Sequence, residues 1–138
     1  DRIEVLGNGA IAIGDYKTGT PPTAPQVKSG LSPQLTLEAA IALEGGFPGL
    51  AARTVDELVY IALKGAAVAG EELVLDLGDS SPDAEAIAAK AGLQKFVGQF
   101  DSQGQAYLSK PRVLLERYAG DYDHLARVKE WSAVEDRD

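Results

Sequence analysis

The chain has 138 residues, of which 45% are apolar and 25% charged, and it contains no cysteine. This length suffices for one compact domain with a modest core, so we expect a single domain over residues 1–138. The lack of cysteine excludes disulfides, thiolate zinc sites and iron–sulfur clusters within it. No apolar run approaches the roughly 18 residues of a membrane span, and no leader opens the chain, which predicts a soluble, cytoplasmic protein without membrane partners.

The charge balance is acidic, with a net charge of −8 and a pI near 4.6. Domains that bind nucleic acid by themselves usually present a basic face, because the ligand is a polyanion. The composition therefore argues against strong DNA binding by this chain alone.

The first seventeen residues predict an antiparallel β-hairpin. Apolar segments at residues 1–6 and 11–17 flank Gly7-Asn8-Gly9, whose residue types favour the positive φ angles of a tight turn. If these three residues form the loop, Asp1 lies opposite Asp15. A two-residue turn at Asn8-Gly9 would instead place Asp1 opposite Tyr16.

The pairing register of the two strands decides whether the Asp1 and Asp15 carboxylates lie close enough to form a site. Opposed residues on one face have Cβ atoms about 4.5–5.5 Å apart, so facing Asp1 and Asp15 carboxylates repel each other unless a proton, a cation or a lysine intervenes. Lys17 lies on the same face as Asp15, because strand side chains alternate. Mg²⁺ or Mn²⁺ accepts one or two carboxylates, which makes a hydrolytic metal site one interpretation. An ordinary charged surface hairpin is the other.

A loop and a helix follow the hairpin. Residues 18–30 are rich in Pro, Thr and Gly and predict a loop, in which Lys28 is either a phosphate contact or a solvated side chain. Ser32 and Pro33 are typical of a helix start. The expected apolar stripe consists of Leu37, Ala40, Ile41 and Leu43, and the helix ends at Gly45-Gly46.

The middle of the chain predicts two strands and a long helix. The apolar run in residues 55–63 favours a buried strand, although Thr54-Val55-Asp56-Glu57 imitates a capping box. Residues 73–77 predict a more exposed strand. Residues 79–82 are typical of a helix start, and the apolar stripe that follows, as far as Phe100, is expected to be core.

The last third carries no strong motif. Residues 106–117 include three basic side chains that contact a DNA backbone or pair with acids at the surface: Lys110, Arg112 and Arg117. A final helix is expected over residues 121–134. His124 is the single histidine and is a poor candidate for a metal ligand.

Several segments together resemble one protein family. They are residues 1–17, the continuation Thr18-Gly19-Thr20-Pro21-Pro22, the helix opening at residues 33–40 and the tail at residues 120–132. This combination resembles the PD-(D/E)XK nuclease domain of the RecB group, and within it the C-terminal part of AddB-type subunits of bacterial helicase–nucleases, in their alphaproteobacterial form.

The resemblance implies an α/β fold with the restriction-endonuclease-like core, a mixed sheet flanked by helices. The family also has a helix before the first aspartate and a Gly-Arg lead-in to the strand. Neither precedes Asp1 here. We therefore expect the chain to be part of a larger protein, without the N-terminal helix of the core.

The resemblance also implies roles for individual residues. Asp1 and Asp15 match the family's metal ligands, the Tyr16 carbonyl would complete the Mg²⁺ or Mn²⁺ shell, and Lys17 matches the catalytic lysine. Gln34 matches the glutamine of the Gln-x-x-x-Tyr helix motif. The tyrosine of that motif is replaced by Glu38, so its role does not transfer.

The implied function is a metal-dependent DNA exonuclease domain within a helicase–nuclease that processes double-strand breaks for recombinational repair. Its implied partners are DNA and an AddA-type helicase–nuclease subunit, and no iron–sulfur cluster has ligands in this segment. The alternative is a catalytically inactive nuclease fold that acts as a scaffold or interaction module.

Overall fold

The computed structural model describes residues 1–65, 70–107 and 125. The described elements are β1 (Arg2–Val5), β2 (Ile11–Lys17), α1 (Ala24–Lys28), α2 (Gln34–Leu43), β3 (Val55–Ala62), β4 (Glu71–Val74) and α3 (Pro82–Phe100). The chain divides into two compact units, Asp1–Gly98 and Gln99–Asp138. The sheet lies wholly in the first unit, and the expectation of one domain over the whole chain stays a prediction.

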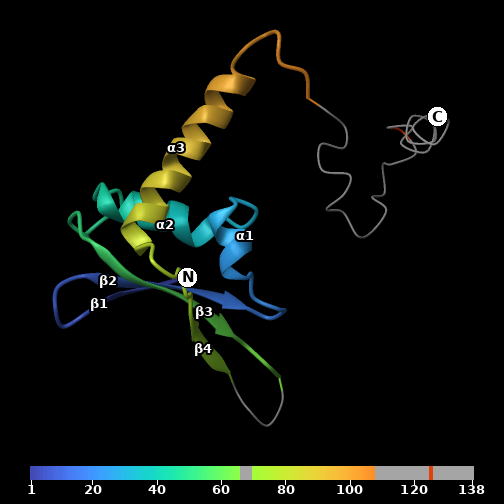
Figure 1. Ribbon diagram of the computed structural model, residues 1–138. Helices are drawn as coiled ribbons and strands as arrows, with labels where there is room; N and C mark the ends of the chain where they lie inside the picture. The colour runs from blue at the N-terminus through green and yellow to red at the C-terminus, as the bar shows by residue number, and fades with distance from the viewer. Residues whose placement is uncertain (66–69, 108–124, 126–138) are drawn as a thin grey trace. The chain divides into compact units, whose positions relative to one another are not determined.

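The four strands form one mixed sheet in the order β1-β2-β3-β4. β1 pairs with β2 and β3 with β4 in antiparallel fashion, whereas the central β2 and β3 run parallel. A parallel pair needs a crossover connection, and α1 and α2 provide it. Figure 1 shows these helices on one side of the sheet. The expected mixed sheet with flanking helices is thus confirmed.

The hairpin has the register that a three-residue loop requires. Arg2 pairs with Gly14 and Val5 with Ile11, and one further step along the ladder places Asp1 opposite Asp15. Of the loop glycines only Gly9 takes a positive φ, at 86°. The alternative two-residue turn is therefore wrong, and Gly9 supplies a positive φ angle as the residue types of the loop suggest.

The segment expected to be a loop contains a short helix, α1. Its start is fixed by Gln26, whose side-chain oxygen accepts a hydrogen bond from the Thr23 N–H at 2.8 Å, one half of a capping box. Lys28 has an exposed side chain, as one of the two expectations had it, but its ammonium is paired within the chain. Its ammonium donates to the Leu77 carbonyl at 2.9 Å and lies 3.7 Å from Glu85.

Helix α2 begins one residue later than expected, and only part of its expected apolar stripe is buried. Pro33 is its N-cap residue, and the buried side chains are Leu35, Thr36, Ala39, Ala40 and Ala42. Ile41, assigned to the core from the sequence, is 44% exposed. The helix ends at Leu43, just before the expected Gly45-Gly46. A φ of 68° at Gly45 allows the Gly46 N–H to bond the Ile41 carbonyl at 2.9 Å.

Both further strands and the long helix are present, with shifted details. The strand over residues 55–63 is confirmed as β3, and the exposed strand occurs as β4, two residues before its expected start. Helix α3 starts at Pro82 as expected. Its apolar stripe was expected to be core, which is wrong for the described residues, where only Ala86 of this helix is buried.

The core lies between the helices and one face of the sheet. Its largest fully buried side chains are Ile11, Ile13, Leu35, Leu58 and Thr36. Expectations for the basic segment with Lys110, Arg112 and Arg117, for the final helix and for His124 lie outside the described residues. Across the part of the chain that is described, no helix has both the length and the apolar character needed to cross a membrane.

Candidate active site

The carboxyl end of β2 brings an acid and a base together at the edge of the core. Asp15 follows Ile11 and Ile13 on the helix-covered face of the sheet, so this residue is only 4% exposed. The Lys17 ammonium lies 2.5 Å from Asp15 Oδ2. This ion pair gives the buried carboxylate oxygen a cationic partner.

Gln34, the first residue of helix α2, lies beside Lys17. Its side-chain oxygen accepts a hydrogen bond from the Lys17 ammonium at 3.1 Å. The amide nitrogen of the same side chain lies 3.4 and 3.5 Å from the two carboxylate oxygens of Asp1. The four residues singled out in the sequence therefore form one connected group, with Gln34 between the ammonium and the Asp1 carboxylate.

The Tyr16 backbone carbonyl is the group that the resemblance assigns to the metal shell, and the strand pairing gives its direction. Carbonyls alternate in direction along a strand, and the Lys17 carbonyl accepts from the Leu63 N–H beside β3 at 2.8 Å. The Tyr16 carbonyl therefore points to the β1 side, beyond the last paired residues, Arg2 and Gly14. It lies on the edge of the sheet to which Asp1 belongs.

Two further residues join the group, and the sequence did not assign them a role. Glu38 accepts a hydrogen bond from the Gln34 amide nitrogen at 3.2 Å. Tyr60 of β3 pairs with Asp15 across the parallel ladder and is 2% exposed. Burial, followed by the negative charges of Asp15 and Glu38, raises the pKa of Tyr60 to about 12.

The sequence indicates the position of Glu38 but not that of Tyr60. The four-residue spacing of Gln34 and Glu38 already places both on one helix face. Tyr60 has no comparable signal, since its position beside Asp15 depends on the register of the parallel strands. Its phenol stays protonated beside the two acids.

The residues present fit a divalent cation. Asp15 is a buried carboxylate, and burying a negative charge is costly unless cations surround it. Lys17 supplies one positive charge, but the connected group contains three carboxylates, those of Asp1, Asp15 and Glu38. Within the described ranges no group of three or more His, Asp or Glu side chains is placed to hold a metal. One or two carboxylates, a carbonyl and water molecules are a ligand set that Mg²⁺ accepts.

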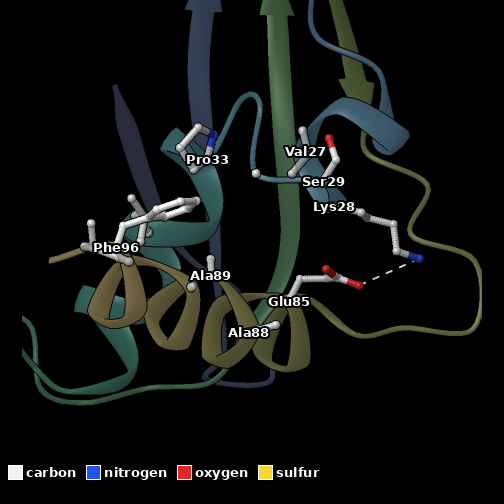
Figure 2. A pocket seen from close by; sticks show the side chains of 12 residues that line it. Val27, Lys28, Ser29, Pro33, Glu85, Ala88, Ala89 and Phe96 are labelled. Carbon is white, nitrogen blue, oxygen red and sulfur yellow. Dashed lines mark ion pairs between the residues drawn. The ribbon is translucent and has the colours of Figure 1, made fainter. Parts of the chain in front are cut away.

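A separate cavity of about 220 Å³ lies among the helices. Figure 2 shows Val27 and Lys28 of α1 on one side of it and Glu85, Ala88, Ala89 and Phe96 of α3 on another. The Lys28–Glu85 ion pair closes one end. None of the residues singled out as site residues lines this cavity, so it is distinct from the group around Asp15.

Comparisons with known proteins identify a family. A family model described as the PD-(D/E)XK nuclease superfamily matches residues 1–130. Uncharacterized proteins of Rickettsia bellii and Rickettsia conorii are each 53% identical over 47 residues, and one of Rickettsia typhi is 55% identical over 47 residues. The matches cover 34% of this chain and 5–6% of each relative. No solved structure matches the chain.

Proposed function

Because the chain belongs to the PD-(D/E)XK nuclease superfamily, we propose that it is a metal-dependent deoxyribonuclease domain that hydrolyses phosphodiester bonds at the Asp15 site. The observation that carries the proposal is the buried Asp15 carboxylate with the Lys17 ammonium 2.5 Å away and Gln34 hydrogen-bonded to that ammonium. A surface hairpin without chemistry would leave its carboxylates in solvent, whereas Asp15 is 4% exposed.

Each residue has a defined task in this proposal. Asp1, Asp15 and the Tyr16 carbonyl hold Mg²⁺ or Mn²⁺, which when bound supplies Lewis acidity at the phosphate and an acidified water. Lys17 orients the attacking water and neutralises the charge that develops on the phosphoryl oxygens. Gln34 keeps the ammonium in place through its side-chain oxygen.

We further propose that the domain works as an exonuclease inside a helicase–nuclease that processes double-strand breaks, with DNA and an AddA-type subunit as partners. The resemblance to AddB-type subunits supports this role. The relatives are much longer proteins, of which the chain covers 5–6%, so other segments have room to bind and deliver DNA. The net charge of −8 also favours delivery by other segments.

The decisive test is replacement of the lysine in the full-length protein. Lys17→Ala is expected to lower the rate of Mg²⁺-dependent cleavage of linear duplex DNA by about 10²–10⁴-fold, the range found when a positioned catalytic group is removed. Lys64→Ala serves as the matched control, because Lys64 is exposed and pairs only with Glu71 among the described residues.

Two results would contradict the proposal. If the Lys17→Ala variant cleaves DNA at the wild-type rate, the catalytic role assigned to Lys17 is wrong. A wild-type protein that takes up no Mn²⁺ at millimolar concentration in a calorimetric titration would favour the inactive, scaffolding alternative. Binding that disappears in Asp15→Ala supports the site.

A further inference from the structure

Glu38 occupies a position for which the family resemblance offers no role, and the structure gives it a definite partner. It lies one helical turn after Gln34 on α2, and its carboxylate accepts from the Gln34 amide nitrogen at 3.2 Å. This contact is shorter than either contact from the same nitrogen to Asp1, at 3.4 and 3.5 Å. Glu38 therefore makes the tightest contact on that side of the amide.

The surrounding charges allow only one orientation of the Gln34 amide. In the observed orientation the oxygen faces the Lys17 ammonium and the nitrogen faces two carboxylates. A flipped amide would turn its N–H groups toward a cation and its oxygen toward two anions, so that every one of these contacts would become repulsive.

Lys17 depends on this orientation. Its side chain is 31% exposed, and a lysine ammonium on a flexible four-carbon stem adopts many positions unless an acceptor holds it. Among the described residues its acceptors are Asp15 and the Gln34 oxygen. The Gln34 oxygen is therefore the second acceptor that holds the ammonium beside Asp15.

We propose that Glu38 is a positioning residue, which holds the Gln34 amide so that its oxygen faces Lys17. The inference rests on the proposed nuclease function and deepens it. Glu38 contacts neither the phosphate nor the metal in this scheme, and acts on Lys17 through Gln34. Its effect should therefore fall on the chemical step and not on metal binding.

The test compares three variants in the full-length protein: Glu38→Ala, Glu38→Gln and the control Glu57→Gln. We expect Glu38→Ala to lower kcat by about 10–100-fold, as for other residues that orient a catalytic group, while KM for DNA and the Kd for Mn²⁺ change less than about twofold. Glu38→Gln keeps an acceptor oxygen and should restore kcat to within about threefold of wild type. Glu57 is exposed on β3 and its partner Ala12 lies on the opposite face of the sheet from Asp15, so its variant should match wild type.

A second readout needs neither metal nor activity. The side-chain amide resonance of Gln34, assigned by its loss in Gln34→Glu, should shift in metal-free Glu38→Ala and stay unshifted in Glu57→Gln. Unfolding curves identify any variant that fails to fold. If Glu38→Ala does not fold, Glu38→Gln is compared with wild type instead, and its Gln34 amide resonance should lie close to that of wild type.

The outcomes separate the inference from the function on which it rests. If Glu38→Ala weakens Mn²⁺ binding as much as Asp1→Ala does, Glu38 is a ligand and the positioning role is wrong. If kcat and the Gln34 resonance are unchanged in Glu38→Ala, or if Glu38→Gln is as slow as Glu38→Ala, the role is also overturned. Absence of metal-dependent cleavage in wild type contradicts the nuclease proposal instead.

Discussion

At the scale of single residues, Tyr60 links the site to the pH dependence of stability. Burial and the neighbouring Asp15 and Glu38 charges raise the pKa of Tyr60 to about 12, against about 10 for an unfolded chain. The folded state therefore keeps a proton that the unfolded state loses between about pH 10 and pH 12. The stabilisation is complete below pH 10 and is lost as the pH rises through this window.

Urea unfolding at pH 9, 10, 11 and 12 checks this prediction. The free energy of unfolding of wild type should fall across the window, and Tyr60→Phe should show a smaller fall because it has no phenol to titrate. Tyr107→Phe is the matched control, since that ring is 78% exposed. Identical slopes for wild type and Tyr60→Phe would show that the phenol does not stay protonated preferentially in the folded state.

Which residues of the site could be found from the sequence depends on local geometry. Asp1 and Asp15 were brought together by counting back from a three-residue loop, because the loop length fixes an antiparallel register. Gln34 was found only through the family motif, since no rule of spacing joins a helix to a strand seventeen residues earlier. Tyr60 was missed, because the register of parallel strands is set by helix packing rather than by a turn.

At the scale of elements, the apolar periodicity of the sequence predicted where a helix forms but not whether its apolar face is buried. The stripe on α3 is amphipathic, yet Ile87, Phe96 and Val97 are 53–65% exposed. A stripe shows which face of a helix is apolar, and only packing decides whether that face is covered. Helix α1 was missed for the opposite reason, because Pro, Thr and Gly suggested a loop although Thr23 and Gln26 form half of a capping box.

Helix α3 also offers a stabilising substitution. Gly92 lies within the helix, and a Cβ built there meets nothing within 4 Å. Gly92→Ala should therefore raise the free energy of unfolding by about 0.5–1 kcal/mol, because alanine loses less backbone entropy than glycine in a helix. Denaturant unfolding of wild type and variant at one pH measures the difference.

The control for this prediction is Gly45→Ala at the end of α2. There the backbone has a φ of 68°, and a Cβ would lie 3.1 Å from the Ala52 nitrogen. This change should destabilise the protein by more than about 1 kcal/mol, since alanine at a positive φ is strained. A Gly92→Ala variant less stable than wild type would mean that the helix is bent or closely approached at that point.

At the scale of the whole molecule, the acidic net charge disfavours DNA binding by this chain, although the proposed cleavage needs DNA at the Asp15 site. A nuclease site needs the DNA backbone to approach the Asp15 group, but the net charge of −8 repels a polyanion. Non-specific DNA binding depends on Lys and Arg neutralising phosphates, with typical Kd values of about 10⁻⁴–10⁻⁶ M at physiological salt. Among the described residues, the lysine at the site, Lys17, is already paired with an acid. Its ammonium lies 2.5 Å from Asp15 Oδ2.

We therefore expect the 138-residue chain to bind a fluorescent DNA duplex with a Kd weaker than about 10⁻⁴ M at physiological salt. The Rickettsia relatives, of which the chain covers only 5–6%, should bind the same duplex more tightly, with an affinity that falls steeply as salt increases. Anisotropy titrations of both proteins at two salt concentrations make the comparison. Micromolar binding by the 138-residue chain would mean that the DNA-binding residues lie within this acidic chain. Other segments would then not be needed to bring DNA to the site.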